Sequence, residues 1–254
     1  MGIGDQLMFA GEAKKHFAAT GRRLAMIDWK GRHHWHEVWD YNQKIVPPGE
    51  PGPFDVMRQG GGERPYIEKK LSRLWQWKPY TPIPGEIFLT DEERRWGEQF
   101  AGQILIDPYG KRIGHSNKQW GELKWANLVR ELLREGIEVA HMGPAGTRPF
   151  PGARWIKTPT FRHAAAVMAQ ARAVVAQEGG LHHLAACFRT PAVVIWSEFI
   201  SPAHTGYDFQ TNIRYATRAC GMRVDCAGCR RSLDAISTDE VAAALMLKLT
   251  KEAA

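Results

Sequence analysis

The sequence has no long apolar run and only four cysteines. No stretch approaches the roughly 18 consecutive apolar residues of a membrane span, so no transmembrane segment is expected. The amino terminus lacks the cationic start and apolar core of a secretory signal peptide, which predicts a cytoplasmic protein. In that reducing compartment the cysteines are expected to stay unpaired rather than to form disulfides.

The sequence also lacks internal repeats and long low-complexity tracts. Its 254 residues are enough for one large domain or two small ones. With 44% hydrophobic and 24% charged residues, the composition is typical of a globular protein. Ten tryptophans are many for this length, and most are expected in the core, although such rings also line pockets for sugars and bases.

Basic side chains exceed acidic ones, and the excess is denser near the amino terminus. Residues 1–85 carry 13 basic and 9 acidic side chains, a net charge of +4, whereas residues 86–254 carry 21 and 18, a net charge of +3. A basic surface favours anionic partners, although a charge this modest is also typical of an ordinary solvated surface. No RNA- or DNA-binding motif accompanies the charge.

Short apolar runs alternate with amphipathic segments in the second part of the chain, which is typical of a parallel α/β sheet. Strands are expected at 104–108, 138–143, 173–178 and 192–197. Helices are expected at 122–135, 161–171, 180–188 and 241–249, the first with a buried face of Trp125, Leu128, Val129, Leu132 and Leu133 and the last behind a capping box of Ser237 and Glu240.

The first part is less regular. A helix is expected at 5–19, a strand at 23–29, and a few short strands and a helix around 66–76. Residues 47–65 are too rich in Pro and Gly for a helix or an interior strand.

A second Pro-rich stretch, at 78–86, indicates a boundary, and Thr90 with Glu93 forms a capping box that opens a helix beyond it. The predicted domains are therefore a small N-terminal lobe of residues 1–85 and a larger lobe of residues 86–254.

Three loops are expected to lie where open parallel sheets bind ligands. The first is QEGG at 177–180, whose glycines let a ligand approach the backbone and whose following helix offers free N–H groups to a diphosphate. Glu178 can accept hydrogen bonds from sugar hydroxyls, and His182 and His183 lie in the first helical turn. Glycine pairs also end many strands as plain tight turns, so this loop alone does not decide its own role.

The second loop, residues 111–120, carries Lys118 before a Trp and a helix, where a lysine can reach a phosphate, although a surface lysine is the commoner role. The third is the N-terminus, where Asp5 follows Gly4 at the start of a helix. An aspartate there is usually only an N-cap. As a functional residue it would be a general base that takes a proton from an acceptor hydroxyl.

Together these three segments resemble the heptosyltransferase family, glycosyltransferase family 9. GIGDQLMFAGEAKKHF (2–17) is similar to the family's opening, where a Gly-Asp pair starts the first helix. NKQWGELKWANLVRELLREG (117–136) resembles its Lys-x-Trp motif and helix. VVAQEGGLHHLAACFRTPAVVIW (174–196) resembles its Asp-Thr-Gly-Leu-x-His-Leu-x-Ala signature and the strand that follows. The segments occur in the family's order.

The resemblance implies an α/β fold of the GT-B type, with two Rossmann-like lobes of which the N-terminal one is reduced. It implies that residues 1–85 face the acceptor and residues 86–254 bind the donor. The implied activity is inverting, metal-independent transfer of a sugar from a nucleotide-diphosphate sugar to a hydroxyl of a glycan or another anionic acceptor, such as a lipopolysaccharide core. No cofactor is required.

The family's motifs also assign roles to residues. Asp5 corresponds to the catalytic base, and Lys118 to the lysine that contacts the donor phosphate. The loop that holds donor diphosphate and sugar corresponds to Glu178, Gly179, Gly180 and His183. Further sugar or acceptor contacts are expected from Gly4, Gln6, His182, His204, Thr205 and Tyr207, the last three in a polar segment at 201–212 that is equally typical of a plain surface loop.

The chain departs from the family in two respects. Glu178 stands where the signature has Asp and Gly179 where it has Thr, which leaves the identity of the donor sugar open. The strand that normally precedes the Gly-Asp turn is absent, and the N-terminal lobe is about half the expected size, which leaves room for a different acceptor.

The remaining motif is CGMRVDCAGC, which contains Cys220, Cys226 and Cys229. Cys-x-x-Cys can bind zinc. The second Cys-x-x-Cys of a strong zinc site is missing, so a metal-free loop is preferred over a zinc site.

Two alternative functions share this architecture. A sugar-nucleotide epimerase or hydrolase would need extra carboxylates around the anomeric carbon, and the sequence does not locate them. A glycosyltransferase acting on hydroxymethylated bases of phage DNA would suit the basic, reduced first lobe, as would transfer to a phosphorylated lipopolysaccharide core.

Overall fold

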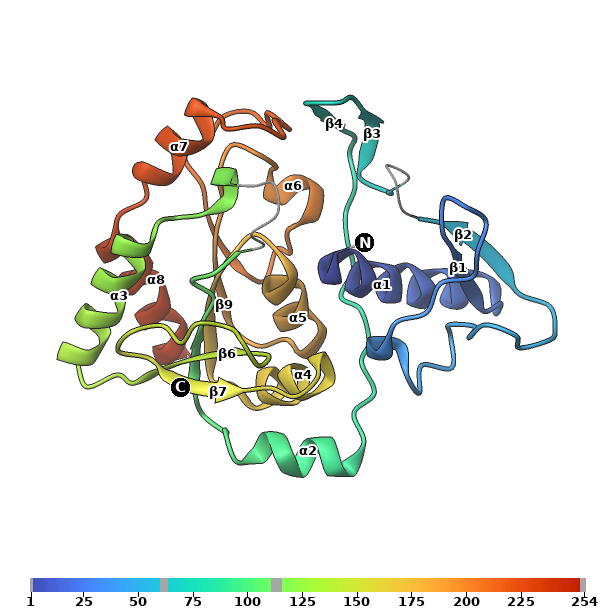
Figure 1. Ribbon diagram of the computed structural model, residues 1–254, viewed down its shortest axis with the longest axis horizontal. Helices are drawn as coiled ribbons and strands as arrows, with labels where there is room; N and C mark the ends of the chain where they lie inside the picture. The colour runs from blue at the N-terminus through green and yellow to red at the C-terminus, as the bar shows by residue number, and fades with distance from the viewer. Residues whose placement is uncertain (1, 60–63, 111–115, 252–254) are drawn as a thin grey trace.

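The computed structural model describes residues 2–59, 64–110 and 116–251 (Figure 1). Its largest element is a six-stranded parallel sheet with the spatial order β10, β9, β8, β5, β6, β7. In chain order its strands are β5 (Ile104–Ile106), β6 (Val139–Gly143), β7 (Arg154–Lys157), β8 (Ala173–Gln177), β9 (Ala192–Ile195) and β10 (Thr211–Ile213). The α/β class and the parallel sheet predicted from the alternation are confirmed.

Helices cover both faces of this sheet because successive strand side chains point in opposite directions. Leu105 and Val174 enter a core beside α4 and α5, whereas Ile106 and Val175 enter a second core beneath α3 and α8. The helices of this part are α2 (Asp91–Glu98), α3 (Glu122–Arg134), α4 (Phe161–Gln170), α5 (Gly180–Phe188), α6 (Pro202–Thr205), α7 (Ala227–Asp234) and α8 (Thr238–Lys251), with a 3₁₀ turn η2 (Ser116–Lys118).

The first part of the chain is smaller, and much of it lies to the right in Figure 1. Its elements are α1 (Ile3–Thr20), β1 (Leu24–Ile27), η1 (Glu37–Trp39), β2 (Asp55–Arg58), β3 (Ile67–Lys70) and β4 (Trp75–Trp77). β1 and β2 pair in parallel, and β3 and β4 form an antiparallel pair. α1 packs against α5, so Leu7 and Leu184 belong to one buried cluster.

Several sequence predictions need correction. The helix expected around 66–76 is wrong, because β3 and β4 occupy this segment. Trp75 and Trp77 both pack against Phe199, with ring centroids 6.1 and 5.3 Å away. Leu133 was expected on the buried face of α3, but its side chain is 43% exposed. The elements β7, β10, α6 and α7 were not predicted.

Among the described residues, none of the helices has the length and apolarity needed to cross a bilayer. The assignment of residues 1–85 and 86–254 to separate domains stays a prediction.

Candidate functional site

A cavity of about 540 Å³ lies where the start of α1 meets the carboxyl ends of β5 and β8. Eight of the sequence-predicted residues line it: Gly4, Asp5, Lys118, Glu178, Gly179, Gly180, His183 and Thr205. The first part of the chain adds Arg64, Tyr66 and Trp75 to the wall. Five segments far apart in the sequence therefore meet at one concave surface, which is the usual form of a ligand site.

The amino-terminal ends of two helices, α1 and α5, meet at this cavity. A Cβ atom at Gly4 would lie 2.8 Å from His183 Cδ2, and one at Gly180 would collide with the Ile3 side chain. Glycine at both positions therefore permits the close approach of the two helix starts. Each helix end presents backbone N–H groups and the positive end of its dipole, so the pair favours an anionic ligand.

Asp5 is held by a second set of contacts at the start of α1. Its Oδ2 accepts a hydrogen bond of 3.0 Å from the Gly2 backbone N–H, and its Oδ1 accepts one of 2.6 Å from the Tyr66 hydroxyl. Arg64 Nε forms an ion pair with Oδ1 at 2.9 Å. Asp5 thus lies at the third helical position and Gly2 is the N-cap. Burial and the nearby Asp5 carboxylate raise the pKa of Tyr66 well above its ordinary range.

Lys118 lies at the end of η2 and forms an ion pair with Glu178. Its ammonium also lies 4.8 Å from the centre of the Phe199 ring. The positive charge therefore sits inside the cavity wall, beside the start of α5. Residues 111–115 of the predicted 111–120 loop lie outside the described residues.

Two further cavity residues, Gln177 and Asp107, lie at strand ends and were given no role from the sequence, although Gln177 belongs to the predicted QEGG loop. Gln177, at the end of β8, accepts a hydrogen bond of 2.5 Å from the Trp120 N–H and donates one of 3.2 Å to the Asp107 carbonyl oxygen. It therefore connects β8, the end of β5 and the turn that carries Lys118. Asp107 itself directly follows β5, and burial raises the pKa of its carboxyl to about 7. The signal for both was their position directly at a strand end.

The two histidines of α5 are buried and neutral. The Gly179 N–H donates to His182 Nδ1 at 2.9 Å, so Nε2 carries the proton and donates to the Thr205 carbonyl at 3.1 Å. His183 Nδ1 lies 3.0 Å from the Tyr207 hydroxyl. Burial lowers the pKa of His182 to about 4 and that of His183 well below its ordinary value.

The other predicted contacts divide into two groups. Thr205 lines the cavity, and its buried hydroxyl has no hydrogen-bond partner among the described residues. Gln6, His182, His204 and Tyr207 do not line it. Gln6 Nε2 lies 3.1 Å from His34 Nε2 in the first part of the chain, while His204 lines a separate hollow with Trp77 and Cys220.

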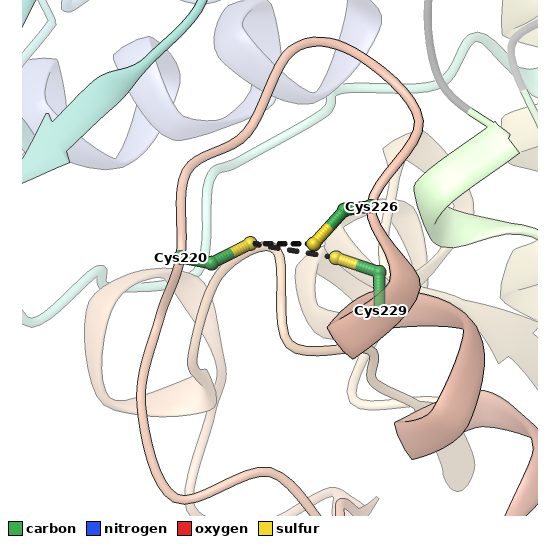
Figure 2. Close-up of side chains that lie close together, drawn as sticks. All are labelled: Cys220, Cys226 and Cys229. Carbon is green, nitrogen blue, oxygen red and sulfur yellow. Dashed lines mark hydrogen bonds between the residues drawn. The ribbon is translucent and has the colours of Figure 1, made fainter.

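The three cysteines of the CGMRVDCAGC motif converge outside this cavity (Figure 2). Cys229 is buried at the start of α7, and the other two are partly exposed. A hydrogen bond with the Cys229 thiol lowers the pKa of Cys220 to about 6. Thiol groups this close are also potential metal ligands.

Comparisons with known proteins agree at the level of the fold. No protein-family model and no curated protein matches the sequence. The structure is similar to the bacterial iron-containing dodecameric glycosyltransferase TibC from enterotoxigenic E. coli, with a TM-score of 0.67, 14% identity, and coverage of 100% of this chain and 75% of that one. It is also similar to a family 9 glycosyl transferase from Veillonella parvula, with a TM-score of 0.66, 14% identity, and coverage of 99% and 95%.

A third similar structure is the ADP-heptose lipopolysaccharide heptosyltransferase II of E. coli, with a TM-score of 0.53 and 23% identity. The match covers 70% of this chain but only 57% of the length of that enzyme. The chain therefore has the GT-B fold of family 9 glycosyltransferases, and the resemblance seen in the sequence is confirmed for the fold.

Proposed function

We propose that the protein is a glycosyltransferase that moves a sugar from a nucleotide-diphosphate sugar to an acceptor hydroxyl. The observation that carries this proposal is the convergence of the starts of α1 and α5, Lys118 and the Asp5 carboxylate on one cavity. Two helix dipoles and an ammonium favour a diphosphate, while a carboxylate suits a hydroxyl that must lose its proton. The shared fold with family 9 glycosyltransferases supports the same activity.

In the proposed reaction the acceptor oxygen forms a bond to the anomeric carbon while the bond from that carbon to the diphosphate oxygen breaks. The bonding electrons leave with the diphosphate, and the hydroxyl proton passes to Asp5. A single displacement of this kind inverts the anomeric centre. Lys118 and the N–H groups at the start of α5 stabilise the charge that develops on the leaving group, so the proposed step does not depend on a metal ion.

The contacts of Asp5 suit this role. A carboxylate oxygen offers two lone pairs, and Oδ2 uses one of them for the Gly2 N–H. The other lone pair of Oδ2 is proposed to accept a hydrogen bond from the hydroxyl group of the acceptor sugar. Tyr66 and Arg64 hold the opposite oxygen and fix the orientation of the carboxylate.

On the donor side, Lys118 forms an ion pair with Glu178, so we propose that both residues change partners when the donor binds. A diphosphate that enters the cavity would take Lys118, which would free Glu178 to accept hydrogen bonds from sugar hydroxyls. The buried hydroxyl of Thr205 is a further group for the donor. The donor is proposed to be an ADP-sugar or a related sugar nucleotide, because the named heptosyltransferase neighbour uses ADP-heptose.

The acceptor is proposed to be an anionic glycan, because the guanidinium of Arg64 lies in the wall beside the base. A lipopolysaccharide-like core, the acceptor class in the name of that same neighbour, meets this description.

A thermal-shift screen across nucleoside diphosphates and sugar nucleotides tests the proposal. A ligand that binds only the folded state stabilises it and therefore raises the melting temperature. At a ligand concentration of 100 times the dissociation constant, the gain in the free energy of unfolding is about 2.7 kcal/mol. We expect at least one nucleoside diphosphate to do so, and its matching sugar nucleotide to lose the sugar when a glycan acceptor is added. If no member of either set raised the melting temperature, the proposed donor site would be wrong.

A further inference from the structure

The thiol groups of Cys220, Cys226 and Cys229 lie at metal-ligand spacing (Figure 2). Cys220 Sγ lies 3.8 Å from Cys226 Sγ and 3.4 Å from Cys229 Sγ, and the three sulfurs lie within 4.8 Å of one another. A disulfide would require a separation of about 2.05 Å. In tetrahedral coordination, metal–sulfur bonds of about 2.3 Å place neighbouring sulfurs about 3.8 Å apart.

The protein backbone holds the cysteines in this arrangement. The N–H groups of Cys220 and Gly221 donate to the carbonyls of Glu198 and Phe199 at 2.7 and 2.9 Å. Cys226 is the N-cap of α7, and its N–H donates to Asn117 Oδ1 at 2.9 Å. The thiols thus come from the two ends of the segment 220–229, and separate hydrogen bonds fix each end. A metal ion bound between the thiols would therefore join the two ends.

We propose that Cys220, Cys226 and Cys229 bind one thiolate-preferring metal ion, zinc or iron, as a structural centre that fixes the wall of the donor cavity. Sulfur ligands favour these metals over magnesium, calcium or manganese, which prefer oxygen. Three protein ligands leave the fourth tetrahedral position to solvent or to another side chain.

The segment 220–229 forms hydrogen bonds with residues in the cavity wall and next to it. Asn117 Nδ2 donates to the carbonyls of Met222 and Val224, both at 2.8 Å, and Asn117 directly precedes Lys118. The Gly221 carbonyl accepts a hydrogen bond of 2.9 Å from the N–H of Trp75.

Phe199, whose carbonyl accepts the Gly221 N–H, places its ring 4.8 Å from the Lys118 ammonium. Metal binding at the cysteines would therefore restrict Lys118, Phe199 and Trp75 together. An effect of the metal on nucleotide affinity rests on the proposed function, whereas metal binding itself does not.

The direct test is the metal content of the purified full-length chain, prepared in a thiol reductant without added metal and measured by elemental mass spectrometry. We expect about one zinc or iron per chain, since structural thiolate sites bind zinc tightly. Cys226→Ser should lose most of this metal. Cys187→Ser removes a cysteine of α5 that lies outside the cluster, so it is the matched control and should keep the full content.

The measurement also separates zinc from iron. Equal metal content in the wild type and in Cys226→Ser would overturn the proposal.

A second measurement keeps the proposal testable if Cys226→Ser does not fold. Wild-type protein exchanged with cobalt(II) should develop a near-ultraviolet absorption band from sulfur-to-cobalt charge transfer, whose intensity reports the number of thiolates. A cobalt spectrum without this band would contradict a cysteine site. Neither readout involves a nucleotide, so a failure here is distinguishable from a failure of the proposed transferase activity.

Discussion

At the scale of single residues, the role of Asp5 depends on what holds its carboxylate. A single position carries two hydrogen bonds and an ion pair, so this residue is more than a helix cap. In Asp5→Asn one carboxylate oxygen becomes an NH2 group, which cannot accept a hydrogen bond, so the donors on that side lose their partner. We expect a loss of stability of about 1–3 kcal/mol and a loss of transfer rate of about 10²–10⁴-fold.

Tyr66→Phe is the matched control, because it removes one hydrogen bond from the same carboxylate and leaves the base in place. Its stability should fall by about 1 kcal/mol, and its transfer rate should fall less than that of Asp5→Asn because the base remains and Arg64 still holds the carboxylate. Chemical denaturation and a turnover assay with the donor found in the thermal-shift screen check both expectations. Turnover by Asp5→Asn within a few-fold of the wild type would show that the base lies elsewhere.

Asp107 predicts a pH dependence of stability. Its pKa is raised to about 7 in the folded state by burial, against an ordinary value of 3.8. Between these values the unfolded chain releases a proton that the folded chain retains. The free energy of unfolding that the protonated carboxyl contributes is therefore fully present below about pH 4 and is lost as the pH rises to about 7. Each unit of difference between the folded and unfolded pKa corresponds to ~1.4 kcal/mol.

Asp107→Asn removes this ionisation while keeping the shape of the side chain. We expect its melting temperature to exceed that of the wild type at pH 8 by roughly 9–18 °C, and the difference to shrink towards pH 5. The exposed Asp208→Asn is the control and should change little at either pH. A difference that did not depend on pH would show that Asp107 does not titrate in this range.

At the scale of elements, the contact between α1 and α5 positions the cavity. Gly4→Ala would place a methyl group 2.8 Å from the His183 ring and push the two helix starts apart. We expect a loss of about 1–3 kcal/mol of stability, the usual cost of overpacking a core, together with weaker binding of nucleoside diphosphate.

Gly2→Ala is the control for this change, because its new Cβ would lie 3.5 Å from Asp5 Oδ2, an ordinary contact distance. Thermal melts in the presence and absence of the nucleotide measure both effects. Equal stability of Gly4→Ala and the wild type would mean that α1 and α5 are not closely apposed.

Helices and strands were predictable from the sequence where a short window of neighbouring residues already shows which side chains are buried. The strands β5, β6, β8 and β9 are short apolar runs, and α3 and α5 follow from one-sided apolar faces and glycine boundaries. The segment 66–76 was misread as a helix: β3 and β4 pair with each other, and Trp75 and Trp77 of β4 pack against Phe199, more than 120 residues further along the chain. Such stabilisation by distant residues leaves little trace in a short sequence window.

The candidate site shows the same division. Glu178, Gly179 and Gly180 lie at a strand end with a helix behind them, so their position followed from the local pattern. Arg64 and Tyr66 reach Asp5 from about 60 residues away, through an irregular stretch whose path only the tertiary packing decides. Their place in the cavity therefore had no local signal.

At the scale of the whole molecule, the net charge is +7, and several of the basic side chains form ion pairs. In the first part of the chain, basic side chains pair with carboxylates: Arg22 with Asp55, Arg23 with Glu50, Arg32 with Asp28, and Lys14 and Lys44 with Glu86. This pairing favours a glycan acceptor over duplex DNA.

We therefore expect binding to duplex DNA to be weak and to depend little on salt. The logarithm of the binding constant should fall with the logarithm of the salt concentration with a slope of roughly 0.9 per phosphate contact, for at most about two contacts. Fluorescence anisotropy with a labelled duplex over a range of salt concentrations measures the slope. A slope equivalent to six or more contacts would instead favour modified DNA as the acceptor.

We propose that a donor diphosphate lies between the starts of α1 and α5 and Lys118. Calorimetric titration of the nucleoside diphosphate found in the thermal-shift screen, into wild type and Lys118→Ala, tests it most directly. Loss of a charge-assisted contact of about 1.5–3 kcal/mol predicts affinity about 10- to 150-fold weaker in Lys118→Ala. The exposed Lys15→Ala, on α1, should bind like the wild type. Unchanged affinity in Lys118→Ala would contradict the account.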